Sequence, residues 1–539
     1  MKLFRLMNYV LIATLAFVLI GCGGGGGNAN KPIVDDITDT STIVDDLDDI
    51  RDDEGNINLE YLDNVKLTMW SVIGEPDQTV FKKMVEQFNK EYMGMIQIDV
   101  QYVGHYDYYN ALDSTYANDY ESFPEMCFMH NEKTLEYALK GYFYPLNSIM
   151  DATGIEFDFN QVYDNIGRTV VYENDRYGVP VDAHGFLTQF RQDIIKKNNL
   201  GFDNNTRYIP KNMAEYQELL TKTRAVADSG ELWVRDINKG QDHSWYQLKT
   251  GNPKLTTSVT SEAFYPEFWQ SADPDGLSAL YVNGGSILDA QGKVNFHNNA
   301  GFVKYITDQV DRYNSKLMGA SGTHSEMFGT GACIMFPEGP WWVSQQFSFL
   351  WNNAELRNEG NGVTAADAAD PVYNSPYIAS RPTGWWTTDD TLPNASKWYG
   401  NGHVVTITRQ VKSMQKAAAA LVFAKWYTQG QKDENNYNLT TWCASGHVPA
   451  WKNVYESSGY KAALAQNITL QALGDPADIM ALESAQYATL LIDGVAKCVT
   501  SVTAELQSSN GCTVERAKEI INEVASSTQA SLDLLRLQF

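Results

Sequence analysis

The sequence predicts an α/β fold, and the pattern of residues 65–102 is the clearest reason. Apolar and polar residues alternate over 65–72 and again over 96–102, which is the period of a strand with one buried face. Between these strands Asp77 is a favourable N-cap for a helix, and Gly94 ends it. Apolar residues at helical spacing complete that helix: Val80, Phe81, Met84, Val85 and Phe88. A strand, a helix and a strand in this order predict a βαβ unit, and therefore a parallel sheet.

Strands and helices keep alternating along the rest of the chain, which places its body in the α/β class. Further strands are expected at 126–129, 177–181, 185–191, 333–336 and 404–408. Further helices are expected at 106–119, 131–140, 193–199, 210–227, 300–314, 417–427 and 514–537. Pro180 lies within a short strand, and proline donates no backbone hydrogen bond, so we expect that strand at a sheet edge or a crossover.

The composition excludes several classes of protein. At about 100–200 residues per domain, 539 residues predict three domains or two large lobes. Lys and Arg total 41 against 66 Asp and Glu, and the net charge of -25 argues against binding to nucleic acid or to anionic lipid. A mean hydropathy of -0.35 excludes a polytopic membrane protein. The 13 Trp, 30 Tyr and 22 Phe supply many flat faces for a large core, for ligand stacking, or for both.

The N-terminus is typical of a secretory signal peptide. Lys2 and Arg5 precede an apolar run of 12 residues from Tyr9 to Ile20, whereas a bilayer span needs about 20. The run ends in Leu-Ile-Gly-Cys at 19–22, which resembles the bacterial lipobox. That resemblance implies cleavage after residue 21 and lipid on Cys22. The alternative is an ordinary signal peptide followed by a chance cysteine.

Residues 22–63 are expected to form a lipidated, extended tether. Five consecutive glycines, Gly23 to Gly27, come first, and residues 31–63 then hold 12 acidic and two basic residues. Glycine and self-repelling charge cannot bury a core, so the segment is predicted to be flexible. Its Asp spacing is similar to that of calcium loops, but Gly55 does not match an EF-hand and a solvated linker is favoured.

The remaining cysteines and histidines suggest no metal site. Five cysteines follow residue 22, and no pair has the CxxC spacing of zinc or thioredoxin motifs. Cys498 and Cys512 could form one disulfide, whereas Cys127 and Cys333 lie in apolar runs that favour buried thiols. The eight histidines are scattered along the chain. No metal ion and no cofactor is therefore expected.

Catalytic signatures are absent from the sequence. GxSxG, HExxH and the P-loop fail to match, and residues 329–331 lack the third glycine of GxGxxG. A glycosidase needs only two carboxylates, but among 66 acidic residues the sequence cannot select a pair.

Four motifs together resemble one family, the lipid-anchored extracellular solute-binding proteins of ABC importers in the maltose-binding-protein-like branch. The first is the strand ending at Trp70 with the helix that follows it. The second is Pro-Glu-Met-Cys-Phe-Met-His at 124–130 with Gly-Tyr-Phe-Tyr-Pro-Leu at 141–146, although His130 stands where the family usually has Asp. The third is Tyr-Gly-Val-Pro-Val-Asp at 177–182, which is similar to the family's first interlobe crossover.

The fourth motif is the most specific. Residues 327–335 run into Gly-Pro-Trp at 339–341, which is similar to the family's F-x-x-G-x-A-x-M followed by G-P-W. A late motif, Gly-His-Val-Pro-Ala at 446–450, extends the match from residue 64 to about residue 455.

This resemblance implies a two-lobed periplasmic-binding-protein-like fold of type II, with a ligand cleft between lobes joined by hinge crossovers. By analogy the N-terminal lobe comprises residues 64–180 plus 403–440, and the C-terminal lobe comprises 181–402 plus 441–539. The implied protein is no enzyme. It is a monomer, lipid-anchored at the extracellular face of the cell membrane, that captures a sugar or oligosaccharide and delivers it to an ABC permease.

Candidate ligand contacts follow from the chemistry of sugars. Their apolar C–H faces suit flat aromatic rings, and their hydroxyl rims suit planar polar groups. The candidates lie after strands and near the crossovers: Trp70, His130, Asp182, His184, Trp341, Trp342, Trp385, Trp386 and His403. The alternative is a core position for Trp70, a surface helix cap for His130, and a covering loop for Trp385 and Trp386.

Two other function classes stay open at this stage. One is a lipid-anchored enzyme that acts on glycans, which turnover of a sugar would distinguish from binding. The other is a solute-binding protein for a polyamine or a peptide, because a cationic ligand would suit the acidic body.

Overall fold

The computed structural model describes residues 36–51, 58, 62–75, 77–237, 244–249, 264–268, 273–319, 324–340, 376–466, 468–480, 487–508 and 511–537. The predicted signal peptide, Cys22 and the glycine run therefore lie outside the described residues, as do Trp341 and Trp342. Among the described helices, none is both long enough and apolar enough to cross a membrane.

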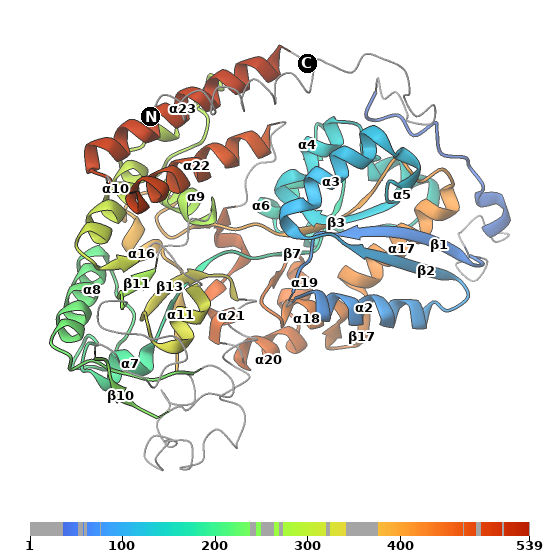
Figure 1. The fold of residues 1–539 in the computed structure, drawn as a ribbon. Coiled ribbons are helices and arrows are strands. Elements are labelled where there is room, and N and C mark those ends of the chain that lie inside the picture. Colours follow the sequence, from blue (N-terminus) through green and yellow to red (C-terminus); the bar gives the residue numbers. More distant parts are fainter. Residues whose placement is uncertain are drawn as a thin grey trace.

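Two lobes are visible in Figure 1, and each is built around a five-stranded sheet. In the first sheet the strand order is β2-β1-β3-β16-β6. Strands β1, β2 and β3 run parallel, as the βαβ pattern predicts, while β16 is antiparallel to β3 and β6. Their bounds are β1 Val65–Ser71, β2 Ile96–Tyr102, β3 Met126–His130, β6 Val179–Pro180 and β16 His403–Ile407. Pro180 thus lies in an edge strand, which confirms the expectation.

The second sheet has the order β12-β11-β13-β8-β14. Strand β11 is parallel to β12 and β13, and β8 is antiparallel to β13 and β14. Their bounds are β8 Leu187–Phe190, β11 Glu267–Phe268, β12 Met318–Gly319, β13 Met335–Glu338 and β14 Ile378–Ser380. Short two-stranded pairs complete the strands: β4 Val171–Tyr172 with β5 Asp175–Arg176, β7 Asp182–Ala183 with β19 Val448–Pro449, β9 Trp233–Val234 with β10 Tyr246–Gln247, β15 Trp398–Tyr399 with β20 Ile479–Met480, and β17 Gln431–Asp433 with β18 Asn436–Tyr437.

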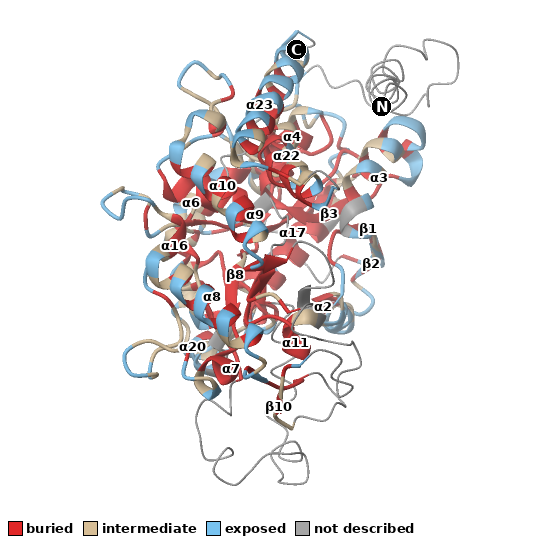
Figure 2. Ribbon diagram, turned by 60° about the vertical axis from the view of Figure 1, so that its left-hand side comes forward, coloured by how far each residue is buried: buried red, intermediate tan, exposed pale blue. Residues whose placement is uncertain are grey.

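Helices cover both sheets, and the buried residues gather beneath them (Figure 2). Around the first core lie α2 Asp77–Glu91, α3 His105–Asn118, α4 Thr134–Leu139, α5 Leu146–Thr153, α6 Asp164–Gly167, α17 Met414–Gln429, α18 Asn438–Cys443, α19 Lys452–Tyr455, α20 Ser458–Gln466 and α21 Ile468–Leu473. Around the second core lie α7 Gln192–Lys197, α8 Met213–Asp228, α9 Asp273–Val282, α10 Ala300–Asn314, α11 His324–Thr330, α16 Thr383–Trp386, α22 Ala488–Gln507 and α23 Val514–Arg536.

The chain passes between the two cores three times. Leu187 belongs to the first core and Phe190 to the second, and the chain returns between Tyr399 and Val404. The third passage follows Ile479, before α22. Residues 441–479 were expected in the C-terminal lobe. Their buried side chains lie in the first core instead, so this segment belongs to the N-terminal lobe.

Part of the acidic segment is docked rather than extended. Ile43 and Leu47 are buried in the first core, and Leu47 opens a short 3-10 helix, Leu47–Ile50. Asp46 accepts hydrogen bonds from the Ser413 hydroxyl and the Gln415 backbone N–H at the start of α17. Because two apolar side chains and a helix-capping carboxylate hold it, the expectation of a flexible tether is wrong for residues 36–51.

The cysteines of the described residues are all free and buried. The Cys498 thiol donates to the carbonyl of Gly494, and the Cys512 thiol donates to the carbonyl of Thr513. Each thiol is directed to a backbone oxygen near it in sequence, so the suggested disulfide between them is wrong. Buried thiols at Cys127 and Cys333 are confirmed.

Candidate functional site

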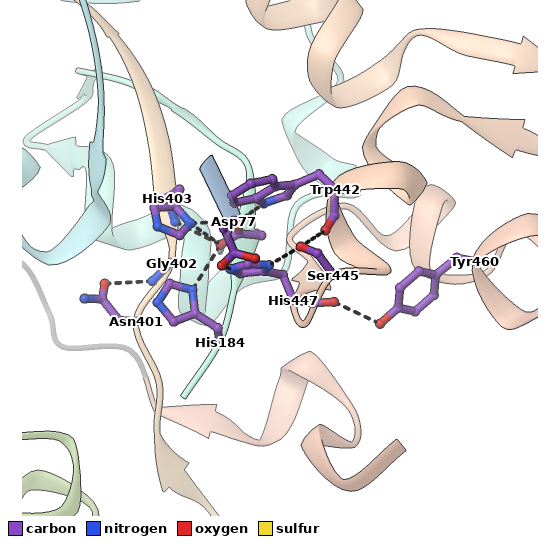
Figure 3. A network of polar contacts seen from close by, with 10 residues as sticks. Asp77, His184, Asn401, Gly402, His403, Trp442, Ser445, His447 and Tyr460 are labelled. Atoms are coloured by element: carbon purple, nitrogen blue, oxygen red, sulfur yellow. Dashed lines mark hydrogen bonds and ion pairs between the residues drawn. The ribbon is translucent and has the colours of Figure 1, made fainter. Parts of the chain in front are cut away.

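A cluster of buried polar side chains occupies the junction of the two lobes (Figure 3). Asp182 lies on β7 and His184 directly after it, just before the first passage of the chain. His403 begins β16 at the second passage, and His447 precedes β19. These four side chains are each at most 7% exposed. The cluster is therefore built from three segments that are far apart in the sequence.

Strand pairing brings these segments together. β7 pairs with β19, and an isolated bridge joins His184 to Asn401, so the three segments run side by side. Gly402 makes the approach possible, because a Cβ atom at this position would lie 2.1 Å from the Asp182 carbonyl oxygen. A non-glycine residue there would force the two passages apart.

The Asp182 carboxylate is the hydrogen-bond acceptor at the centre of the cluster. It accepts a hydrogen bond of 3.0 Å from the His403 backbone N–H and one from the Trp442 indole N–H. The Nδ1 atom of His403 lies 2.9 Å from Oδ2, and that of His184 lies 3.4 Å from Oδ1. Burial alone would raise the pKa of Asp182, but His403 and His447 with these hydrogen bonds hold the pKa well below its usual range. The carboxylate is therefore ionised.

His447 is held by contacts on several sides. Its ring stacks on Trp442 with centroids 4.5 Å apart, and its Nδ1 lies 3.4 Å from the Ser445 hydroxyl. Its Nε2 lies 3.6 Å from the carboxylate of Asp77 at the start of α2. Burial lowers the pKa of His447 well below its usual value, so the ring is neutral. Burial also raises the pKa of Asp77 to about 7.

His130 borders the cluster from the end of β3. Because β16 pairs with β3, His130 lies directly opposite His403, and their ring centroids are 5.3 Å apart. The Nδ1 of His130 lies 2.9 Å from the hydroxyl of Tyr109 on α3. It is a buried residue at the lobe junction rather than a surface helix cap.

Four of the predicted site residues thus meet in one place: His130, Asp182, His184 and His403. Sequence reasoning missed His447, Trp442 and Asp77 as members of the cluster. His447 carried a signal, since it lies in the motif at 446–450 that resembles the solute-binding family. Asp77 was interpreted only as a helix cap.

The predicted tryptophans lie elsewhere. Trp70 is 8% exposed on β1 within the first core. Trp385 and Trp386 belong to the second core, where Trp385 stacks on Tyr216 with centroids 5.4 Å apart. Contact of these three tryptophans with a ligand stays a prediction. The same holds for Trp341 and Trp342, which lie outside the described residues.

A cavity of about 1090 Å³ opens on the first lobe, away from the cluster. It is lined by the C-terminal parts of α2 and α17, including Glu91 and Trp426, and by residues after α5. Asp77, which reaches the cluster, lies at the opposite end of α2, and a helix rises 1.5 Å per residue. This cavity is therefore not part of the lobe junction.

One oxygen of Asp182 and one ring nitrogen each of His184, His403 and His447 all lie within 4.8 Å of one another. Carboxylate and imidazole are ligands of transition metals, so these four residues could hold an ion. Because the histidines are scattered along the sequence, no metal ion was expected, and the convergence of three of them was not foreseen.

The family model for bacterial extracellular solute-binding proteins matches residues 83–467. This chain belongs to that family. Its members are binding proteins rather than enzymes, and the predicted two-lobed architecture is confirmed. No curated protein matches the chain.

Several solved structures have the same fold, and the matched region covers nearly the whole of each of their chains. The GacH receptor of Streptomyces glaucescens, described unliganded and with acarbose, matches with TM-score 0.59 and 14% identity over 86% of this chain and 98% of that one. Maltose-bound MalE3 of T. maritima matches with TM-score 0.57 and 17% identity over 86% and 99%. UgpB of Mycobacterium tuberculosis, bound to glycerophosphocholine, matches with TM-score 0.59 and 13% identity over 87% and 99%.

Proposed function

We propose that this solute-binding protein captures a sugar or oligosaccharide between its two lobes and delivers it to the permease of an ABC importer. The observation that carries the proposal is the lobe junction. The chain segments at the first two passages meet the segment before β19 there, and together they bring carboxylate and imidazole groups close to the Trp442 indole of α18 (Figure 3).

Carbohydrate is favoured over other solutes by chemistry and by similarity. Buried hydroxyls left without partners cost about 1–3 kcal/mol each, so planar polar groups at a junction select sugars strongly. The chain carries 13 Trp and 30 Tyr, which suit apolar sugar faces. Two of the similar structures are described with acarbose or maltose, and one with glycerophosphocholine.

Capture requires the lobes to close on the ligand. A contact between α4 and α22 already links the two cores: the Glu136 carboxylate accepts hydrogen bonds from the Thr489 backbone N–H at 2.9 Å and its hydroxyl at 2.6 Å. Lys133 donates to the same hydroxyl at 3.1 Å. A ligand shifts the lobes toward closure only if it binds the closed state more tightly than the open one.

Lipid on Cys22 would hold the protein at the extracellular face of the membrane. The lipobox-like Leu-Ile-Gly-Cys at 19–22 supports this part of the proposal. Because residues 36–51 pack on the first lobe, only the 13 residues from 23 to 35 separate Cys22 from the folded body. Those residues span at most about 45 Å, so the lobes would stay close to the membrane and to the permease.

A thermal-shift screen of the full chain, purified from its bacterial host in mild detergent, tests the proposal. At 100 times its dissociation constant, a ligand adds about 2.7 kcal/mol to the free energy of unfolding and raises the midpoint by a few degrees. We expect a selective rise with a mono- or oligosaccharide that is recovered unchanged. A rise only with glycerophosphocholine, spermidine or a peptide would overturn the choice of sugar.

A further inference from the structure

Nitrogen and oxygen donors of the cluster at the lobe junction converge on one place. Asp182, His184, His403 and His447 direct one donor atom each into a space where all four atoms lie within 4.8 Å of one another. Asp182 and His184 lie just before the first passage between the lobes, His403 lies at the second, and His447 lies just before β19.

The spacing is close to that of a metal site. Ligand atoms at about 2.0–2.2 Å from a tetrahedral ion lie roughly 3.3–3.5 Å from one another. The Nδ1 of His184 is already 3.4 Å from Asp182 Oδ1, and the Nδ1 of His403 is 3.1 Å from the same oxygen. The His447 nitrogen lies within 4.8 Å of the other three donor atoms, and a shift of its ring toward them would complete a set of three imidazoles and one carboxylate.

The surroundings are those of an enclosed site with outer partners. Trp442 donates to the Asp182 carboxylate, and the Ser445 hydroxyl lies 3.4 Å from His447 Nδ1. Such outer contacts orient ligands in metal sites. Phe128 stacks on the His403 ring at 5.3 Å and closes one side with apolar surface.

The charge of Asp182 points the same way. A buried carboxylate is costly unless a cation or several hydrogen bonds compensate it. Among the described residues, the hydrogen-bond partners of the Asp182 carboxylate are imidazole, indole and backbone N–H groups, and no lysine or arginine forms an ion pair with it. A divalent ion at the meeting point would supply the positive charge.

We propose that Asp182, His184, His403 and His447 bind one divalent transition-metal ion of the zinc class at the junction of the two lobes. The ion ties the segments that carry Asp182, His184 and His403, at the first two passages between the lobes, to the segment that carries His447. This inference does not depend on the identity of the captured solute, because the metal alone is its ligand.

The test is a titration of the full chain with Zn²⁺ after treatment with a chelator and dialysis. Calorimetry and elemental analysis of the dialysed protein measure affinity and stoichiometry. We expect one tightly bound ion per chain and a higher thermal midpoint. Mg²⁺ prefers oxygen ligands and serves as the hard-ion comparison, with no binding expected here.

Matched histidine variants separate this site from adventitious binding. His403→Gln and His447→Gln each remove one ligand and are expected to weaken Zn²⁺ binding at least tenfold. His297→Gln is the control, since His297 lies in the second lobe outside the cluster and the variant should bind as the unmodified chain does. Equal affinity in all three variants, or more than one ion per chain with no preference among the histidines, would overturn the proposal.

A second measurement covers the case in which a cluster variant does not fold. Co²⁺ added to the unmodified chain should give the intense visible absorption of a four-coordinate site with nitrogen ligands, and Zn²⁺ should abolish it. A pale spectrum of hydrated Co²⁺, with no uptake of Zn²⁺, would show that the cluster is a metal-free hydrogen-bonded network. The sugar screen can identify a ligand whether or not the cluster binds a metal ion. Failure of one proposal therefore does not imply failure of the other.

Discussion

The Asp193 carboxylate is the shared ion-pair partner of two buried arginines. Arg191 Nε donates to its Oδ1 at 2.9 Å, and Arg235 Nε donates to its Oδ2 at 2.8 Å. All three side chains are at most 3% exposed. The aspartate therefore compensates charge inside the second lobe.

Replacing Asp193 with asparagine should destabilise the protein strongly. The variant Asp193→Asn keeps the shape but removes the negative charge, and breaking a buried ion pair costs about 3–5 kcal/mol. Urea unfolding followed by circular dichroism measures the loss. Asp308→Asn is the control, because its pair with Lys304 is half-exposed and contributes little. Equal midpoints for the two variants would contradict this account.

The same carboxylate predicts a pH dependence. Burial alone would raise the pKa of Asp193, but the charges of Arg191 and Arg235 outweigh burial, and its pKa is lowered. A lowered folded-state pKa gives stability that is present above the unfolded pKa of about 3.9 and is lost as the pH falls through the folded-state pKa. The free energy of unfolding should drop below pH 4, and less steeply in Asp193→Asn. Parallel slopes would refute the assignment.

Single residues differ in how far the sequence could place them. Pro180 was correctly expected at an edge because its missing N–H is a local property. His447 was not connected to Asp182 because their approach depends on the pairing of β7 with β19, which are separated by about half of the chain. Such long-range pairing leaves no local pattern to detect.

At the scale of elements, the close approach of the first two chain passages requires a glycine at residue 402. In Gly402→Ala the new methyl group would lie 2.1 Å from the Asp182 carbonyl oxygen, so the two passages must separate. We expect a loss of about 1–3 kcal/mol in the free energy of unfolding. Gly104→Ala, where nothing lies within 4 Å, should change stability little. Both values come from denaturant titrations, and equal losses would contradict the close approach.

The docked acidic segment gives a prediction at the same scale. Asp46→Ala removes the acceptor for Gln415 N–H and the Ser413 hydroxyl, so residues 36–51 should detach more often. Hydrogen exchange of this segment should accelerate severalfold, with a stability loss of about 0.5–2 kcal/mol. Asp48→Ala removes an exposed carboxylate and serves as control. Unchanged exchange in Asp46→Ala would mean that the apolar contacts alone hold the segment.

Length alone did not decide which helices were predictable. The helix expected at 300–314 matches α10, whereas α22 at Ala488–Gln507 was missed. Gly494 and several β-branched residues lower the helix propensity of α22. Packing explains the glycine, since a Cβ at Gly494 would lie 2.8 Å from the Thr528 hydroxyl on α23.

For the whole molecule, the contact between α4 and α22 should influence how far the lobes open. In Glu136→Gln the two donors of Thr489 lose a charged acceptor, and hydrogen bonds to charged groups contribute about 1.5–3 kcal/mol. The open state should become more populated, and the radius of gyration from X-ray scattering of the ligand-free chain should increase. Glu121→Gln, an exposed change on the first lobe, is the control. Identical scattering profiles would exclude this contact as a restraint on opening.

The global architecture was predictable because an ordered set of motifs resembled a known family. The lobe boundary was less predictable, since the residues of 439–479 enter the first core through tertiary packing. Of the predicted site residues, those near the crossovers meet at the junction, whereas Trp70, Trp385 and Trp386 pack in the two cores. Contact of any of them with a ligand stays a prediction.

Hydrogen exchange of the full chain with and without the best sugar from the screen tests the central claim most directly. Capture between the lobes predicts slower exchange at the junction, in the segments 126–130, 182–184, 401–403 and 445–449. Slower exchange confined to other regions, such as the cavity beside Glu91 and Trp426, would contradict it.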